Sequence, residues 1–310
     1  MTKVQVKIAP VKLEGGWHGR VLTQCQNGNM HGTEAPQLPN TAAWRAWLHQ
    51  LITDRAAIPG HAVLKYSKTG EVLRGRLITG TGAIEVICKQ SRPLGVRRQL
   101  REMLRASRAR RNFQRALTLL NAGINTARPL ALLEHGFPRR EAWLVSEYIP
   151  DLVDLDHVAL RRMAEVPPER MCAVKRGIIS AVVDLLDRLE KHKLSHRDLK
   201  ASNILLRHWD SDSGQASAWL VDYDGLGGGG GQLARRRQQL VRLAASLRTY
   251  ESITRTDFVR FLRQHPLQTG QASGWKETFR KLAQQVAIVG SRARRPRSHK
   301  IDGYSGEPTP

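Results

Sequence analysis

Acidic residues are scarce in this sequence: 27 Asp and Glu stand against 50 Lys and Arg, which gives a formal net charge of +23. Cysteine is also scarce, and the three cysteines show no C-x-x-C spacing, which argues against a disulfide framework and against a zinc site. No long apolar run is present, so we expect no membrane-spanning helix. The first ten residues lack the apolar segment of a secretory signal. We therefore expect a cytoplasmic protein, and the positive charge bears on its partners rather than on its fold.

Aromatic residues are few, at 5% of the chain, and no zinc-finger spacing or RNP-like aromatic pair accompanies the basic residues. The positive charge gathers in three segments, which are residues 97–115, Arg235–Arg237 and residues 292–300. These segments indicate either an ordinary solvated surface or attraction to a polyanion, and the residues alone leave both interpretations open. Among polyanions we favour an anionic membrane surface or an anionic substrate over nucleic acid, because no nucleic-acid-binding motif is present.

The hydrophobic pattern changes near Pro150. Before this residue it predicts an irregular segment over 1–40, helices over 41–52 and 96–121, and strands over 62–67, 71–78, 83–90 and 142–147. After it, the pattern predicts helices over 171–192, 235–247, 256–264 and 275–289, a short strand over 219–223, and a disordered tail over 291–310. A strand-rich part followed by a helix-rich part is typical of an α+β protein with two segregated lobes.

The segment HRDLKASN, residues 196–203, carries the strongest chemical signal. It matches the catalytic loop H-R-D-L-x-x-x-N of protein kinases, including the apolar strand that follows the Asn. In such a loop Asp198 orients and deprotonates an acceptor hydroxyl, while Asn203 holds a magnesium ion beside the transferring phosphate. Lys200 is placed to neutralise charge that develops on this phosphate.

A second acidic segment, Asp222-Tyr223-Asp224-Gly225, begins nineteen residues after Asn203. It takes the place of the kinase D-F-G segment and predicts Asp222 as the main Mg²⁺ ligand. Tyr and Asp replace Phe and Gly of that motif, so Asp224 stays open as the alternative ligand. Two oxygen ligands from the protein suit Mg²⁺, which keeps several waters.

Upstream, Lys89 ends the strand over 83–90, as the lysine of V-A-I-K does in kinases, and predicts a cation for the α- and β-phosphates of ATP. The segment from Ser146 to Ile149 resembles the hinge between kinase lobes, where the carbonyl of Glu147 and the N–H of Ile149 would bind adenine. The G-x-G-x-x-G phosphate loop is absent. Two alternatives exist for the partner of the lysine: either Glu102 pairs with it, or Lys89 is held in another way.

From Ala62 to about His265 the sequence resembles the lipopolysaccharide core kinases, which phosphorylate heptose or 3-deoxy-octulosonic acid (Kdo). The resemblance rests on HRDLKASN, on VDYDGL, on the basic segment after Lys89, on the run from Leu120 to Leu130, on RRRQQLVRLAASL and on TDFVRFL. Asn112 stands where the family has a glutamate in R-E-W.

The resemblance implies a bilobal protein-kinase-like fold with an antiparallel-sheet N-lobe and a helical C-lobe, ATP with Mg²⁺, and a sugar hydroxyl on a membrane glycolipid as acceptor. We accordingly expect an N-terminal extension with one helix over 1–60, an N-lobe over 61–149, a C-lobe over 150–290 and a basic tail over 291–310. We expect the protein to act in the cytoplasm, peripherally at the inner face of the cytoplasmic membrane.

Two other functions remain open at this point. A compact protein Ser/Thr kinase would explain the HRDLK segment, but no A-P-E follows, and only Leu226–Ala234 separates the DYDG segment from the next helix. The platform that binds an extended peptide is therefore missing. A nucleotide-binding pseudokinase would explain Asn112 and the missing glycine pattern, although Lys89, Asp198, Asn203 and Asp222 are all present.

Overall fold

The chain divides into two compact units, residues 1–150 and residues 151–310, in the computed structural model. The structure describes residues 5–26, 37–67, 70–92, 106–136, 141–211, 215–228, 232–265 and 280–287. The predicted tail over 291–310 and residues 97–105 of the basic segment over 97–115 lie outside these residues.

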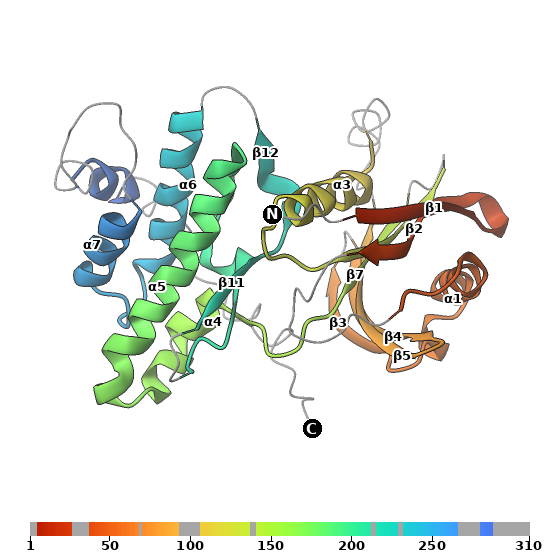
Figure 1. The fold of residues 1–310 in the computed structure, drawn as a ribbon, viewed down its shortest axis with the longest axis horizontal. Helices are drawn as coiled ribbons and strands as arrows, with labels where there is room; N and C mark the ends of the chain where they lie inside the picture. Colours follow the sequence, from red (N-terminus) through yellow and green to blue (C-terminus); the bar gives the residue numbers. More distant parts are fainter. Residues whose placement is uncertain are drawn as a thin grey trace. The chain divides into compact units, whose positions relative to one another are not determined.

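A single antiparallel sheet forms the framework of the first unit (Figure 1). Its strand order is β1-β2-β6-β7-β5-β4-β3. In chain order the unit contains β1 (Gln5–Lys12), η1 (Glu14–Gly16), β2 (Trp17–Gln26), α1 (Thr41–Thr53), η2 (Arg55–Ala57), β3 (Ala62–Ser67), β4 (Gly70–Thr79), β5 (Gly82–Ser91), α3 (Arg108–Asn121), β6 (Pro129–His135) and β7 (Ala142–Glu147).

The expectation of an irregular segment over residues 1–40 is wrong for the described residues 5–26. Strands β1 and β2 pair with each other, and β2 pairs with β6, so this segment extends the sheet. Pro10 and a register shift next to Ile8 interrupt the alternation of apolar residues that would have revealed β1. An edge strand tolerates both, because one side of it pairs with no other strand and the missing N–H of proline can face that side. Val11 and Val21 are buried and join the core of the unit.

Helix α1 seals one face of this sheet. Its first turn is capped by Asn40, whose side chain accepts a hydrogen bond from the backbone of the helix. Trp44 and Trp47 pack edge to face, with ring centroids 6.1 Å apart. Both are buried, and each indole N–H reaches a backbone carbonyl: Trp44 donates to Leu22 at 2.8 Å and Trp47 to Arg76 at 3.0 Å. The two tryptophans therefore bury large apolar surfaces without leaving a polar group unpaired.

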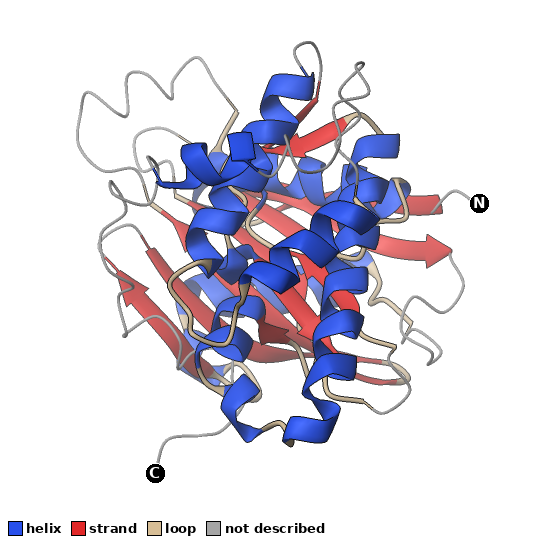
Figure 2. Cartoon of the chain, turned by 90° about the vertical axis from the view of Figure 1, so that its left-hand side faces the viewer, coloured by secondary structure: helices blue, strands red, loops and turns tan. Residues whose placement is uncertain are grey.

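The second unit is richer in helices, which Figure 2 draws in blue, and carries two small sheets. Its elements are β8 (Val153–Asp154), α4 (Leu155–Leu160), η3 (Arg162–Glu165), α5 (Pro168–Lys191), β9 (Leu194–His196), η4 (Ala201–Asn203), β10 (Ile204–Arg207), β11 (Ser217–Leu220), η5 (Tyr223–Gly225), β12 (Leu226–Gly228), α6 (Gln232–Leu247) and α7 (Arg255–Gln264). A further helical stretch covers residues 280–287. The strand predicted over 219–223 ends at Leu220, because the DYDG segment turns into η5.

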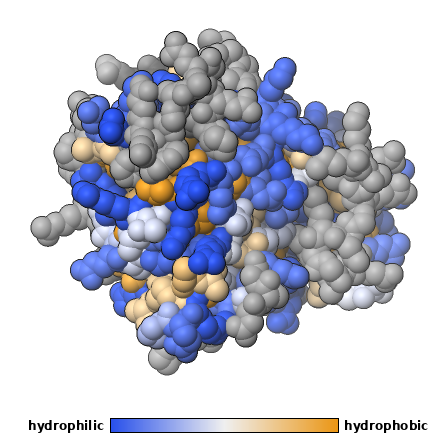
Figure 3. All heavy atoms as spheres, turned by 60° about the vertical axis from the view of Figure 1, so that its left-hand side comes forward, coloured by the Kyte–Doolittle hydropathy of each residue, from blue (hydrophilic) through white to orange (hydrophobic). Residues whose placement is uncertain are grey.

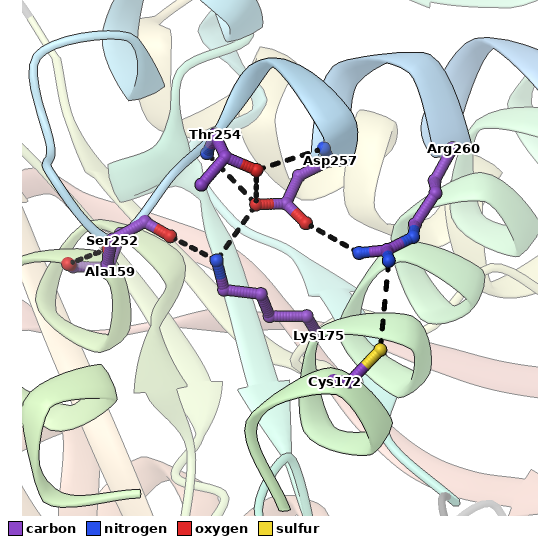
Figure 4. Close-up of polar contacts among 7 residues, drawn as sticks. All are labelled: Ala159, Cys172, Lys175, Ser252, Thr254, Asp257 and Arg260. Carbon is purple, nitrogen blue, oxygen red and sulfur yellow. Dashed lines mark hydrogen bonds and ion pairs between the residues drawn. The ribbon is translucent and has the colours of Figure 1, made fainter. Parts of the chain in front are cut away.

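A buried carboxylate fastens α7 to α5 (Figure 4). Asp257 accepts a hydrogen bond from Lys175 of α5 at 2.9 Å and one from Arg260 at 3.2 Å. It also forms a capping box with Thr254 at the start of α7. The guanidinium of Arg260 reaches back to the sulfur of Cys172 on α5 at 3.7 Å. We call Asp257, Lys175, Arg260 and Thr254 the α5–α7 clasp.

The surface is largely hydrophilic where Figure 3 displays it, with apolar atoms gathered in limited areas. Among the helices that the structure describes, none has both the length and the apolar character needed to cross a bilayer.

Candidate active site

The HRDLKASN segment lies between the short strands β9 and β10, and its first residue is a buried structural histidine. The side chain of His196 is 1% exposed. Its backbone N–H donates to the side-chain oxygen of Gln239 at 2.8 Å, and its ring Nε2 bonds the carbonyl of Asp222 at 2.7 Å. The histidine therefore joins the catalytic loop to the DYDG segment.

Three of the predicted site residues come together in this unit. The side-chain amide of Asn203 donates to the carbonyl of Asp198 at 3.0 Å, and the carbonyl of Asn203 accepts from the backbone N–H of Val221 at 3.0 Å. Val221 directly precedes Asp222 in the chain. The fold thus brings the predicted base and the two predicted metal ligands into one hydrogen-bonded group.

Asp222 combines an unusual backbone conformation with a buried carboxylate oxygen. Its backbone adopts the left-handed conformation, with φ 64° and ψ 81°, which is costly for a residue other than glycine and concentrates at functional sites. Its Oδ1 is buried and has no hydrogen-bond partner within the described part of the chain. A buried carboxylate oxygen without a partner is unfavourable unless a cation satisfies it.

Gly225 allows the DYDG segment to pack against the catalytic loop. A Cβ atom at this position would lie 2.7 Å from the ring of His196 and 3.0 Å from the backbone nitrogen of Asp198. The carbonyl of Gly225 accepts the N–H of Arg197 at 2.8 Å. A larger residue would separate Asp222 from the loop that carries Asp198.

The residues present fit a magnesium ion. Asn203 uses its NH₂ group to bond Asp198, which leaves its side-chain oxygen for another partner. This oxygen and the buried Oδ1 of Asp222 would be the hard oxygen ligands that Mg²⁺ prefers.

Two cations flank the carboxylate of Asp198. Lys200 lies 2.8 Å from Oδ2, and Arg242 of α6 lies 2.9 Å from Oδ1. Burial acts to raise the pKa of Asp198, but the hydrogen bond and charge of Lys200, together with the charges of Arg242 and His196, outweigh it, so the pKa lies below its ordinary value. Asp198 is therefore ionised at neutral pH.

One face of α6 contacts the catalytic loop through three side chains. These contacts were not predicted from the sequence. Gln239 accepts from the backbone of His196, Arg242 pairs with Asp198, and the hydroxyl of Ser246 accepts the N–H of Ala201 at 2.9 Å. The three supporting side chains recur every three or four residues, as one helix face requires. The sequence signal that could have revealed them is this row of polar residues on a helix face that is otherwise buried.

In the first unit, Lys89 and helix α3 lie on the same face of the sheet. Lys89 pairs across strands with Leu144, so the two side chains share a face. Glu134 belongs to this face as well, because its own cross-strand partner lies two residues from Leu144. Arg110 of α3 donates to Glu134 at 2.9 Å, which places the helix over this face. Asn112 follows on the buried side of α3.

The lysine has no carboxylate partner among the described residues. Asn112, where the family resemblance anticipated glutamate, is 4% exposed, and its side-chain oxygen has no hydrogen-bond partner there. Glu102, the other candidate partner, lies outside the described residues. Lys68 and Thr69, between β3 and β4, also lie outside them.

The end of β7 is fixed by backbone and charge. The N–H of Glu147 donates to the carbonyl of Arg128 at 2.9 Å, and the two side chains form a buried ion pair at 3.1 Å. The N–H of Tyr148 donates to the carbonyl of Glu85, whereas the N–H of Ile149 has no hydrogen bond to any described residue. The binding of adenine by Ile149 stays a prediction.

Comparison with known proteins places this site in a family. Residues 94–265, more than half of the chain, match the model of the "Lipopolysaccharide kinase (Kdo/WaaP) family". The chain belongs to this family. The matched region contains the catalytic loop, the DYDG segment and α6.

One curated relative of this family is the 3-deoxy-D-manno-octulosonic acid kinase of Vibrio parahaemolyticus serotype O3:K6 (strain RIMD 2210633). It is 28% identical over 120 residues, which span 38% of this chain and 43% of the relative. The match therefore covers less than half of that kinase.

Among solved structures, "WaaP in complex with acyl carrier protein" matches at a TM-score of 0.56 and 22% identity, over 82% of this chain and 96% of that one. This likeness confirms the predicted protein-kinase-like fold. "Crystal structure of BubR1 kinase domain" is a more distant match, at a TM-score of 0.45 and 13% identity, over 74% of this chain and 80% of that one.

Proposed function

We propose that the protein is an ATP-dependent kinase that phosphorylates a sugar hydroxyl of the lipopolysaccharide core, on Kdo or on heptose. The observation that carries the proposal is the hydrogen-bonded group of Asp198, Asn203 and Asp222, together with the buried Oδ1 of Asp222, which has no hydrogen-bond partner among the described residues. Family membership and the partial match to a Kdo kinase support the choice of acceptor.

In this reaction Asp198 accepts a hydrogen bond from the acceptor hydroxyl and aims its oxygen at the γ-phosphorus of ATP. A new P–O bond forms to this oxygen, the bond from the γ-phosphorus to the bridging oxygen of ADP breaks, and the hydroxyl proton passes to a carboxylate oxygen of Asp198. The lowered pKa of Asp198 keeps it ionised before transfer and favours proton transfer late, when the hydroxyl has become acidic.

Asn203 and Asp222 would hold Mg²⁺, which neutralises phosphate charge when bound. Lys200, at the edge of the carboxylate, would turn toward the transferring phosphoryl group. Lys89 would bind the α- and β-phosphates as a point charge, and the Glu147 carbonyl with the Ile149 N–H would bind the adenine edge.

We also propose that the protein docks on the anionic inner face of the cytoplasmic membrane through its basic segments. The net charge of +23 and the arginines over residues 97–115 support this placement. Each basic residue held near an anionic surface contributes about 1 kcal/mol. Binding to vesicles that contain phosphatidylglycerol should therefore weaken strongly between low and physiological salt. Salt-independent binding would contradict an electrostatic mode.

The test of the enzymatic proposal is transfer of labelled γ-phosphate from ATP to a Kdo-bearing or heptose-bearing lipid A acceptor, followed by mass analysis of the product. The Asp198→Asn variant should lose about 10²- to 10⁴-fold in turnover. Asp184→Asn, which changes an exposed carboxylate on α5, is the matched control and should retain wild-type turnover. Absence of a labelled glycolipid with wild-type protein, or normal transfer by Asp198→Asn, would reject the proposal.

A further inference from the structure

Two cations pair with the carboxylate of Asp198, whereas the catalytic loop itself supplies only one of them. Lys200 at Oδ2 is the catalytic-loop lysine, to which the proposed function assigns the transferring phosphate. Arg242 at Oδ1 comes from α6, outside the HRDLKASN segment. One carboxylate and two cations leave an excess positive charge at the point where the acceptor hydroxyl must bind.

Arg242 is one of three side chains of α6 that contact the catalytic loop. The backbone of the loop is already fixed on both sides of Asp198, by Gln239 at His196 and by Ser246 at Ala201. These two contacts use neutral groups and the same face of α6.

The guanidinium of Arg242 has binding capacity left over. An arginine side chain carries five N–H groups in a planar fork, and here Nη1 bonds Asp198. Within the residues that the structure describes, this contact is the only hydrogen bond or ion pair of the guanidinium. The side chain is 38% exposed, so its remaining donors are accessible to a ligand.

A guanidinium with free donors matches a carboxylate better than a hydroxyl, because two parallel N–H···O bonds can form to one planar anion. Any acceptor whose hydroxyl bonds Asp198 brings its neighbouring substituents against Arg242. Of the two acceptor sugars proposed above, the octulosonic acid carries a carboxylate and heptose does not.

We propose that Arg242 binds the carboxylate of an acidic acceptor sugar and thereby selects this sugar over a neutral one. The inference rests on the proposed function, and it assigns to α6 a role in acceptor specificity. Arg242 touches the substrate on one side and the catalytic carboxylate on the other.

The experiment measures kcat and KM for two acceptors, a Kdo-bearing lipid A precursor and its carboxyl methyl ester. For wild-type protein the ester should raise the acceptor KM about 10- to 100-fold, the loss expected for a charge-assisted hydrogen bond. Arg242→Gln should show the same rise on the acid and no further rise on the ester, with KM for ATP unchanged. Arg248→Gln, an exposed arginine beyond the end of α6, is the matched control and should behave as wild type.

Each other outcome has a definite meaning. Equal losses for Arg242→Gln on acid and ester would show that Arg242 only positions Asp198, and would overturn the inference while the proposed function stands. Wild-type preference for a heptose acceptor that bears phosphate would assign the guanidinium to a phosphate instead, and would also overturn it. Failure of wild-type protein to label any glycolipid, despite binding ATP, would reject the proposed function and this inference with it.

Discussion

Breaking the α5–α7 clasp tests the energetics of the second unit. Asp257→Asn keeps the shape of the side chain but removes the charge that Lys175 and Arg260 share (Figure 4). The side chains of Asp257 and Lys175 are 8% and 13% exposed, so the two cations would lose a partner that water replaces poorly. Breaking a buried pair from one side costs about 3–5 kcal/mol. The amide group can still accept one hydrogen bond, so we expect about 3 kcal/mol.

The assay is native-state hydrogen exchange followed by mass spectrometry, which measures each unit separately. A loss of about 3 kcal/mol should speed exchange of peptides from α7 by about 10²-fold. Peptides from β4 and β5 in the first unit should be unchanged. The matched control is Asp184→Asn on α5, which breaks an exposed pair with Arg188 and should cost no more than about 0.5 kcal/mol. Equal effects of the two variants would refute the reasoning.

The clasp also predicts a pH dependence. Burial acts to raise the pKa of Asp257, but hydrogen bonds from Thr254 and Lys175 and the charge of Lys175 lower it overall. The unfolded chain therefore binds this proton more readily than the folded protein does, so the contribution of Asp257 to stability is complete above its ordinary pKa of about 3.9. It is lost as pH falls through the lower folded pKa. The stability gap between wild type and Asp257→Asn should accordingly narrow below about pH 4, and a constant gap would contradict the assignment.

Three further variants test the site. Gln239→Leu should lower kcat about 10- to 100-fold with KM for ATP unchanged, because the catalytic loop loses its support; steady-state kinetics measures this, and a wild-type kcat would count against the α6 contacts. In magnesium titrations, Asp222→Asn should raise the Mg²⁺ concentration needed for turnover at least about 100-fold, and Asp224→Asn should raise it much less. The reverse order would make Asp224 the ligand. Asn112→Leu should stabilise the first unit by about 1 kcal/mol in hydrogen exchange of α3, because it removes a buried oxygen without a partner; a clear loss of stability would show that this oxygen is satisfied.

Local signals in the sequence predicted much of the fold. Apolar residues at helical spacing after Asn40 located α1, and the alternation after Gly82 located β5 with Lys89 near its end. The linear motif HRDLKASN singled out Asp198 and Asn203 because the spacing within a catalytic loop is carried by consecutive residues. Such features depend on neighbours in the chain.

The features that escaped prediction depend on partners far away in the chain. Strand β1 carries Pro10 and a bulge, and it becomes a strand only because β2 pairs with it and with β6. Arg242 looked like one more basic residue on a helix, since nothing local shows that a helix 44 residues downstream of Asp198 supplies its second cation. Asp222 and Asp224 each have a buried carboxylate oxygen that only the fold creates, so burial does not decide between them and the choice of Asp222 stays a prediction.

The three contacts that α6 makes with the catalytic loop impose a geometric constraint on this helix. Each residue turns the helix by about 100°, since 3.6 residues complete one revolution. Inserting a single residue just before Gln239 would rotate this side chain, Arg242 and Ser246 together relative to the preceding turn, and each would leave the group it now supports. Substitutions on the outward side of α6 would leave all three in place. The outward side of α6 can therefore vary in sequence, whereas an insertion of one residue ahead of Gln239 would break all three contacts.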